Sequence, residues 1–228
     1  MAKQFKFVDI DKTKIPELKR KSVDGFRFYE IDGKAYPSIT TILSIKKTQE
    51  LKEWREKVGD DVANYEMRRA AARGNAVHKI VENYIKGETP SIRNVLPLGL
   101  FRLLRPYVDQ IDNVHLLETQ MCSKKLTIAG QSDCIAEYNG KLSVIDFKTA
   151  NKERQEAWLE NYFLQTTAYA EMYEENFGTP IDQLVVLVAS EDGMVASWVK
   201  EKKDYVPKLQ TAIDNFYKYY EEQNKSKV

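Results

Sequence analysis

The sequence predicts an α/β protein whose mixed β-sheet is flanked by helices, and three observations lead to this fold class. The predicted elements run in the order helices, three strands, a helix, two strands and a last helix, which places helices on the faces of a mixed sheet. Asn139-Gly140 separates two strand-like runs and is the strongest short signal for a two-residue hairpin. Gln183–Ala189 is a nearly continuous apolar run, typical of a buried central strand.

The N-terminal third combines strands with helices. Phe26–Ile31 and Lys34–Tyr36 flank the turn-forming pair Asp32-Gly33, so we expect a hairpin there. Ser38 is a good N-cap for a short helix, and Gly59 is expected to separate two longer helices. The other expected elements are helices over 49–58, 60–86, 98–111, 156–176 and 205–223, a loop over 87–97, and strands over 114–122, 127–138, 141–148 and 194–199.

The length and composition suit one domain with a single sizeable core. The 228 residues are 43% hydrophobic and 30% charged, which is ordinary for a globular protein and leaves little room for long disorder. We therefore expect one domain, with N-terminal strands over 1–36, a helical region over 37–112, and a sheet core with a C-terminal helix over 113–228.

Charge and cysteine content argue against several classes of protein. The net charge of +1 is mild evidence against a strongly basic nucleic-acid binder, although it says nothing about local patches. Cys122 and Cys134 are too few for a disulfide framework, a thiolate zinc site or an all-cysteine iron–sulfur cluster. The first residues resemble neither a signal peptide nor a transit peptide, and no apolar run reaches the ~18 residues of a membrane span. We therefore expect a cytoplasmic protein without membrane contact.

Two carboxylates and a lysine stand out around the predicted hairpin. If Asn139-Gly140 forms the turn, the register places Asp133 directly opposite Asp146. Lys148 lies two residues further along and shares the face of Asp146, because side chains alternate along a strand. Like charges placed opposite each other repel, and a divalent cation or the lysine ammonium would relieve that repulsion.

The alternative is that these charges form only a structural ion pair. The spacing alone is weak evidence, since Asp32-Gly33-Lys34 has the same spacing within a plain turn. Asp146 differs because it ends an apolar strand, where charges are costly, and because the partner strand offers Asp133 in register. The context therefore favours a catalytic role for Asp133, Asp146 and Lys148.

These residues resemble the signature of the PD-(D/E)xK nuclease superfamily, with Asp133 followed by Asp146-Phe147-Lys148. The nine residues Gly74–Glu82 resemble the GxxxHxxxE helix of its RecB-like branch, and Gln165–Tyr169 resembles the QxxxY helix of that branch. Tyr36–Thr40 and 139–146 are also similar to phrases of the mitochondrial genome maintenance exonucleases and their bacterial and phage relatives. The resemblance runs from about Tyr36 to the last helix and implies a restriction-endonuclease-like core preceded by a helical region.

The resemblance also implies a metal centre. His78, Asp133, Asp146 and the Phe147 carbonyl would bind the ion, and Lys148 would orient the attacking water. Carboxylates and a carbonyl suit Mg²⁺, while an imidazole shifts the preference toward Mn²⁺. Related CRISPR-associated nucleases carry four cluster-binding cysteines that this chain lacks, so no iron–sulfur cluster is implied. His115 matches no motif and is expected to be structural.

Several further residues are candidates for binding substrate. Gln165 and Tyr169 share one face of a helix, and the resemblance makes them phosphate-positioning residues, although two ordinary boundary residues would look the same. Ser38 and Thr40 lie in the matching Tyr36–Thr40 phrase and are expected to contact substrate as well.

The helix that carries His78 offers more candidates with more than one reading. Arg68, Arg69 and Arg73 precede His78 and are expected to contact phosphate, although a charge run is more often a solvated face. Glu82 could support a metal ligand, bind a second metal or be a solvated charge. Trp54, Tyr65 and Tyr84 could stack on bases, although aromatic residues more commonly pack in the core.

We therefore expect a metal-dependent DNA exonuclease that prefers single-stranded ends and comes from a bacterium or phage. An endonuclease with the same core is the alternative within enzymes. A non-catalytic nucleic-acid-binding protein on a nuclease scaffold is the alternative outside them, and the complete set of Asp133, Asp146 and Lys148 argues against it.

Overall fold

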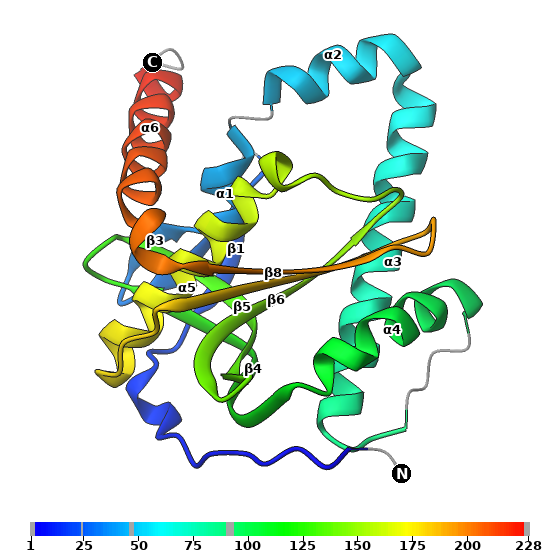
Figure 1. Cartoon of the computed structure of the whole chain (residues 1–228). Helices are drawn as coiled ribbons and strands as arrows, with labels where there is room; N and C mark the ends of the chain where they lie inside the picture. Colours follow the sequence, from blue (N-terminus) through cyan, green and yellow to red (C-terminus); the bar gives the residue numbers. More distant parts are fainter. Residues whose placement is uncertain (1–2, 24, 46–47, 90–93, 226–228) are drawn as a thin grey trace.

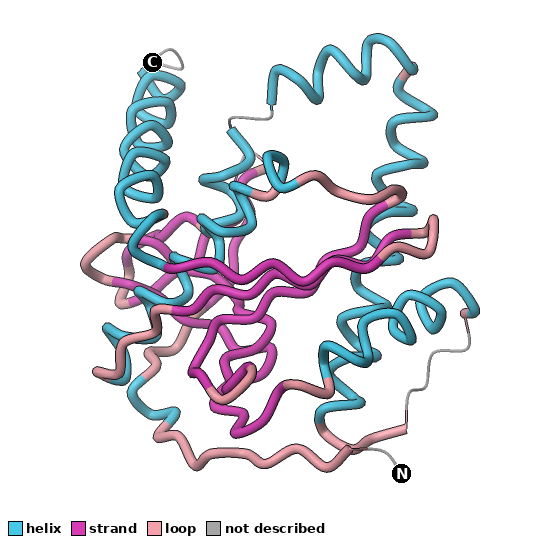
Figure 2. Tube along the Cα trace, in the orientation of Figure 1, coloured by secondary structure: helices cyan, strands magenta, loops and turns pink. Residues whose placement is uncertain are grey.

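A computed structural model describes residues 3–23, 25–45, 48–89 and 94–225, and its main feature is a mixed five-stranded sheet. The strand order is β4-β5-β6-β7-β8; β6 and β7 are parallel and the other neighbours are antiparallel. The strands run across the middle of the molecule, with helices on both sides (Figure 2), so the predicted fold class is confirmed. The strands are β4 (Ile111–Ser123), β5 (Ile128–Tyr138), β6 (Lys141–Ala150), β7 (Gln183–Ser190) and β8 (Val195–Glu201).

Each face of this sheet has its own helices because side chains alternate along the strands. Ile145 and Phe147 of β6 pack in one apolar cluster with α3 (Asp60–Ile85) and α4 (Val95–Val108). Val144 belongs to the opposite cluster, with α5 (Glu160–Phe177), α6 (Val206–Lys225) and α1 (Ile39–Ser44). The central strand is β6, and the apolar run Gln183–Ala189 forms β7 beside it.

A second, three-stranded antiparallel sheet precedes α1. It consists of β1 (Lys19–Val23), β2 (Phe26–Ile31) and β3 (Lys34–Pro37). The predicted hairpin between β2 and β3 is confirmed, with positive φ at Asp32 and Gly33. β1 was not predicted individually, because its residues are polar and exposed along most of its length and show no apolar alternation. Tyr29 and Tyr36 pack with Ala129, so this sheet lies against β5.

Several predicted helix boundaries differ from those observed. α4 begins at Val95, inside the predicted loop, because Asn94 caps it; Pro97 fits the first turn, where its missing N–H has no intrahelical acceptor. The rest of that loop includes residues 90–93, which lie outside the described residues. α4 ends at Val108 and β4 begins at Ile111, so the boundary expected at residue 112 falls within a strand. α5 begins at Glu160 because a separate 3₁₀ turn, η3 (Glu156–Trp158), precedes it.

The N-terminal helices form a frame beside the sheet. α2 (Thr48–Val58) crosses from the end of α1 to the far end of α3, away from the sheet (Figure 1). Gly59, with a φ of +84°, separates α2 from α3 as predicted. The remaining 3₁₀ turns are η1 (Lys12–Lys14) and η4 (Lys202–Asp204). None of the helices in the described ranges combines the length and apolar character that a membrane crossing requires.

Candidate active site

The strand register that predicted the carboxylate pair is confirmed. Asn139 and Gly140 both have positive φ, as a type I′ turn requires, and β5 and β6 pair from Tyr138↔Lys141 to Cys134↔Ile145. Asp133 and Asp146 are the next residues in this register. There the Asp133 carboxylate accepts a hydrogen bond from the backbone N–H of Phe147, at 2.9 Å. The end of the β5–β6 ladder therefore places both carboxylates at one point of the sheet.

His78, Glu118 and Asp133 form a cluster of metal-ligand type. Their ligand atoms lie within 4.8 Å of one another. His78 Nδ1 lies 3.4 Å from Asp133 Oδ1 and 3.6 Å from Glu118 Oε1, and His78 Nε2 lies 2.7 Å from the Phe147 carbonyl oxygen. Because a carbonyl only accepts, Nε2 carries a hydrogen and Nδ1 faces the two carboxylates. The Phe147 carbonyl, expected to bind metal, thus accepts a hydrogen bond from His78.

Glu118 is the member of this cluster that the sequence did not reveal. β4 and β5 pair Leu117 with Cys134 and Thr119 with Ser132, so Glu118 lies opposite Asp133. Its φ of 48° is in the left-handed region that residues other than glycine seldom adopt. The four-residue connection over 124–127 contains no glycine or asparagine that fixes a hairpin register, so no turn signal identified this pair of residues.

The charges in this cluster depend on one another. Burial alone would lower the pKa of His78, but Asp133 and Glu118 outweigh it and raise that pKa to about 10. Burial would raise the pKa of Asp133, but His78 and Lys148 together hold it below its ordinary value. The imidazolium thus partly neutralises two carboxylates that would otherwise repel each other. A divalent cation can take over this neutralising role.

Asp146 and Lys148 form the second part of the centre. Lys148 Nζ lies 2.7 Å from Asp146 Oδ1 and 2.6 Å from Oδ2. Only the contact with Oδ1 has hydrogen-bond geometry, so the buried Oδ2 has no hydrogen bond within the described part of the chain. Burial, together with the charge of Asp133, raises the pKa of Asp146 to about 7 despite the neighbouring ammonium group. Buried carboxylate oxygens rarely lack a hydrogen bond, and this one, whose close neighbour is the Lys148 ammonium, suits a cation.

Lys148 remains a cation in this setting. Burial works against its charge, but Asp146 and Asp133 outweigh burial and raise the pKa of Lys148 above its ordinary value. Its ammonium also lies 5.2 Å from the centre of the Tyr162 ring, on α5. Lys148 can therefore donate hydrogen bonds and neutralise negative charge, and it is unsuited to accept a proton.

A polar cavity of about 570 Å³ is lined in part by His78, Glu118, Asp133 and Lys148, whereas the buried Asp146 lies outside its lining. The predicted residues Ser38, Thr40, Gln165 and Tyr169 all line it, and Gln165 Nε2 donates to Tyr169 Oη at 3.1 Å. The structure thus brings all four residues into the same cavity as the carboxylates. Their contact with substrate stays a prediction. The other lining residues are Arg20, Arg27, Tyr29, Asn75, His78, Lys79, Glu82, Glu118, Gly130, Gln131, Asp133 and Lys148.

The three arginines of α3 lie elsewhere. Arg73 is buried and donates to Thr149 Oγ1 at 3.1 Å and Asn151 Oδ1 at 2.6 Å, and it also pairs with Glu191. Arg69 pairs with Glu191 as well, and Arg68 is an exposed residue outside the cavity lining. The expected phosphate contacts of Arg69 and Arg73 are therefore replaced by internal ion pairs, because α3 passes the β7–β8 turn that carries Glu191.

The other candidates on α2 and α3 differ in their surroundings. Glu82 lines the cavity and pairs with Lys79 at 2.8 Å and Lys86 at 2.6 Å. Tyr84 instead packs at the edge of the α3–α4 cluster and donates to Asp109 at 2.5 Å, which agrees with the alternative of core packing. Tyr65 is 60% exposed and Trp54 is half-buried, and both lie outside the cavity lining. His115 shares a hydrogen bond of 2.6 Å with Tyr173, in keeping with a structural role.

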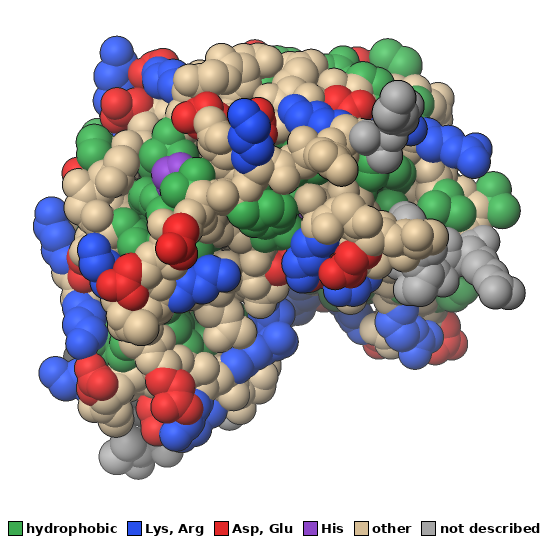
Figure 3. All heavy atoms as spheres, turned by 90° about the horizontal axis from the view of Figure 1, so that it is seen from below, with side chains coloured by type: hydrophobic (Ala, Val, Ile, Leu, Met, Phe, Trp, Pro, Cys, Tyr) green, Lys and Arg blue, Asp and Glu red, His purple; other side chains and the backbone are tan. Residues whose placement is uncertain are grey.

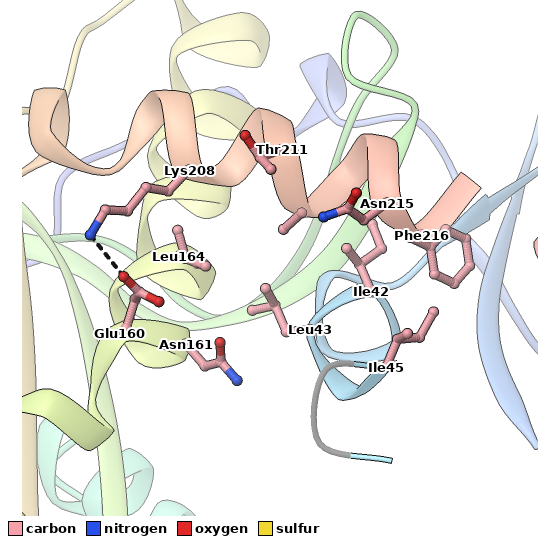
Figure 4. Close-up of a pocket in the computed structure, with 11 residues that line it drawn as sticks. Ile42, Leu43, Ile45, Glu160, Asn161, Leu164, Lys208, Thr211, Asn215 and Phe216 are labelled. Atoms are coloured by element: carbon pink, nitrogen blue, oxygen red, sulfur yellow. Dashed lines mark hydrogen bonds and ion pairs between the residues drawn. The ribbon is translucent and has the colours of Figure 1, made fainter. Parts of the chain in front are cut away.

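A second cavity, of about 480 Å³, is apolar and lies between α1, α5 and α6 (Figure 4). Ile42, Leu43 and Leu164 point into it, and an ion pair of 2.7 Å between Lys208 and Glu160 lies at its rim. The residues that line it include none of the site residues predicted from the sequence.

The face of the molecule in Figure 3 shows acidic and basic side chains interspersed, without a large patch of one sign.

Comparison with known proteins agrees with this geometry. A family model described as "PD-(D/E)XK nuclease superfamily" matches residues 97–223. "Mitochondrial genome maintenance exonuclease 1" of Homo sapiens is 28% identical over 176 residues, covering 70% of this chain and 51% of the human protein. The Mus musculus protein of the same name is 27% identical over 175 residues, with the same coverage. The chain spans about half the length of these relatives.

The relatives bear on the expectations to different degrees. They carry the exonuclease name that the motifs indicated. They are vertebrate proteins named for mitochondria, so they do not support the expected cytoplasmic location or bacterial or phage origin. The family model covers more than half of the chain and includes Asp133, Asp146 and Lys148. The chain therefore belongs to the PD-(D/E)XK nuclease superfamily.

Proposed function

We propose that this chain is a metal-dependent deoxyribonuclease that removes nucleotides from the ends of single-stranded DNA. The observation that carries this proposal is the convergence of His78, Glu118, Asp133 and Lys148 on one polar cavity, with the buried Asp146 paired to Lys148. Such a set of groups serves phosphodiester hydrolysis, in which water attacks phosphorus while the bond to the leaving oxygen breaks. The exonuclease names of the two relatives support the same class of reaction.

The donor set fits a divalent cation. His78 Nδ1, Glu118 and Asp133 would hold the ion, and Asp146, whose Oδ2 accepts no hydrogen bond, is the fourth candidate ligand. Carboxylate oxygens suit Mg²⁺, and the imidazole adds a preference for Mn²⁺. When bound, the ion would polarise a phosphate oxygen and lower the pKa of a water molecule.

The residues of the chain have separate tasks in this proposal. Lys148, held by Asp146, orients the attacking water and stabilises the charge that develops on the phosphate oxygens. The Gln165 amide and the Tyr169 hydroxyl offer hydrogen bonds to a phosphate oxygen across the same cavity. Ser38 and Thr40 also line that cavity, from the start of α1.

The preference for a single-stranded end is proposed from the arrangement of the helices. α1 and α3 both contribute residues to the lining of the pocket, and α2 lies away from the sheet (Figure 1). This helical region is long enough to cover the site, and such a cover would admit the end of a single strand more readily than a duplex. Because the pocket takes residues from the N-terminal sheet, α3 and the main sheet, we also propose that residues 1–228 work as one nuclease domain.

Digestion of DNA substrates that differ in their ends tests the proposal. Linear single strands, covalently closed single-stranded circles of the same sequence and blunt duplexes are incubated with Mn²⁺ or Mg²⁺, and initial rates are compared. We expect rapid digestion of the linear strand and slow digestion of the other two. Equal rates on lines and circles would indicate an endonuclease, and binding without digestion of any substrate would indicate a non-catalytic nucleic-acid-binding protein.

A further inference from the structure

We infer that Arg20 and Arg27, on the N-terminal sheet, bind a backbone phosphate of the substrate strand beside the phosphate that is cut. This second phosphate subsite serves the nuclease function proposed above and rests on it. It lies in the same cavity as the carboxylate cluster but uses residues of a different sheet.

The strand register directs both arginines toward the cavity. Arg20 pairs with Tyr29 across β1 and β2, and Arg27 lies two residues before Tyr29 on β2. Directly paired residues, and residues two apart on a strand, share one face of a sheet. All three line the cavity. Lys19 and Lys21 alternate with Arg20 on β1 and therefore lie on the opposite face.

The two guanidinium groups are unpaired, in contrast to other cations nearby. In the ranges that the structure describes, neither Arg20 nor Arg27 makes a side-chain hydrogen bond or an ion pair. Arg69 and Arg73 are paired with Glu191, and Lys21 is paired with Glu30. Arg27 is moreover half-buried, and a partly desolvated cation without a partner is costly. A site that binds an anion accounts for this arrangement.

The backbone of Arg27 is fixed beside the start of α1, where one exposed hydroxyl group can complete the subsite. Its carbonyl accepts from the Ser38 N–H at 2.9 Å, and its N–H donates to Thr41 Oγ1 at 3.0 Å. These bonds tie β2 to the start of α1. There the buried Ser38 Oγ donates to Thr41 Oγ1 at 3.0 Å, and the exposed Thr40 Oγ1, 2.9 Å from Ser38 Oγ, is the hydroxyl that can reach a phosphate. A planar guanidinium and an adjacent hydroxyl match the oxygens of a phosphate group.

The two ends of the cavity differ in what they need to hold phosphate. At the end with Asp133 and Glu118, the cations of His78 and Lys148 are paired with carboxylates, so this end holds little free positive charge for a phosphate unless a metal ion is bound. The end with Arg20 and Arg27 attracts phosphate without a metal. The subsite should therefore contribute to strand binding in the presence of a chelator, where cleavage is absent.

Strand binding measured in EDTA tests the subsite apart from catalysis. The probe is fluorescein-labelled oligo(dT), and its anisotropy is followed over a range of salt concentrations for Arg27→Gln, Arg20→Gln and Arg27→Lys. Lys19→Gln is the matched control, because Lys19 adjoins Arg20 on the opposite face and is exposed. Thermal melting of each variant checks that it is folded.

We expect Arg27→Gln to raise the Kd about tenfold, as loss of one charge-assisted contact does. The slope of log K against log salt should fall by about 0.7, the value for one phosphate contact on a single strand. Arg20→Gln should act in the same direction, Arg27→Lys should restore part of the affinity, and Lys19→Gln should match the wild type. In the presence of metal, KM should rise more than kcat falls.

The subsite would be overturned if the Arg27→Gln and Arg20→Gln variants were folded and bound the strand with the same Kd and salt slope as the Lys19→Gln control. The two proposals can fail separately. If the wild type cuts DNA and these variants bind normally, the subsite is wrong and the nuclease function stands. If the wild type cuts no DNA but Arg27→Gln weakens binding, the subsite stands as a nucleic-acid-binding element and the nuclease function is wrong.

Discussion

The two ends of the polar cavity are built from unlike groups. At the end formed by α3, β4 and β5, His78 lies against the carboxylates of both Glu118 and Asp133, and its single positive charge cannot balance their two negative charges. At the end formed by β1 and β2, Arg20 and Arg27 have unpaired donors within the described residues and lack an anion. The first end therefore requires a cation and the second requires a phosphate. Changes at the acidic end should alter metal dependence, and changes at the basic end should alter strand affinity.

The largest effect is expected from Asp146→Asn. The substitution keeps the shape of the side chain but removes the charge that holds Lys148 and would bind metal. Cleavage should fall by at least about 10³-fold, as it does when a group acting directly on the transition state is lost. Strand binding in EDTA should change less than twofold, because that affinity comes from the basic end. Cleavage at the wild-type rate by a folded Asp146→Asn protein would show that Asp146 is dispensable.

A graded effect on metal dependence is expected from His78→Ala and Glu118→Gln. Each removes one of three converging ligand atoms, so the metal concentration at half-maximal rate should rise about tenfold or more. Mn²⁺ should restore more activity than Mg²⁺ in Glu118→Gln, where the imidazole remains. The matched control is His115→Gln, since His115 bonds Tyr173 outside the cavity. An unchanged metal curve for His78→Ala would remove His78 from the ligand set.

Arg73→Gln should affect stability and leave strand binding unchanged. Arg73 is buried and linked to Glu191, Asn151 and Thr149, and breaking a buried ion pair costs about 3 kcal/mol. Denaturant unfolding measures this loss, and oligo(dT) binding in EDTA should match the wild type. If Arg73→Gln instead weakened binding as Arg27→Gln is expected to, the contrast between internal and substrate-facing arginines would fail.

The smallest effect is expected where Tyr169 approaches the backbone of β5. A Cβ at Gly130 would lie 2.7 Å from the Tyr169 ring and 3.1 Å from Ile39, so Gly130→Ala must displace the ring. We expect a loss of about 1–3 kcal/mol in stability, together with a raised KM. Gly99→Ala in α4 is the control, because nothing lies within 4 Å of its added Cβ. Equal stability of the two variants would show that the close approach is unimportant.

The residues of the acidic end could be predicted from the sequence only where a turn motif fixes the register of the paired strands. Asn139-Gly140 forms a turn of one type, so the register followed and placed Asp133 near Asp146 and Lys148. Glu118 belongs to the same cluster but lies across a connection without such a signal. Its position depends on the β4–β5 pairing, which the sequence pattern alone left undetermined.

The sequence did not show which arginines are free to bind phosphate. Arg69 and Arg73 were attractive candidates because they precede His78, yet the distant Glu191 occupies them. Arg20 gave no signal because β1 has a polar pattern, and Arg27 lies in a predicted strand, β2, but belongs to no recognised motif. Whether an arginine is free to bind phosphate depends on which acid the tertiary fold brings beside it. Periodicity and motif spacing do not contain that information.

The most direct test of a metal-dependent nuclease centred on the acidic end of the cavity is nucleotide release from labelled, linear single-stranded DNA. It is measured against metal concentration for the wild type and Asp133→Asn. Asp133 contacts both His78 and the Phe147 N–H, so its charge is essential to the acidic end. We predict no release by the wild type in EDTA, saturable release with Mn²⁺ or Mg²⁺, and no release by Asp133→Asn at any metal concentration. Release in EDTA, or equal release by the folded variant, would contradict a metal-dependent nuclease centred on these residues.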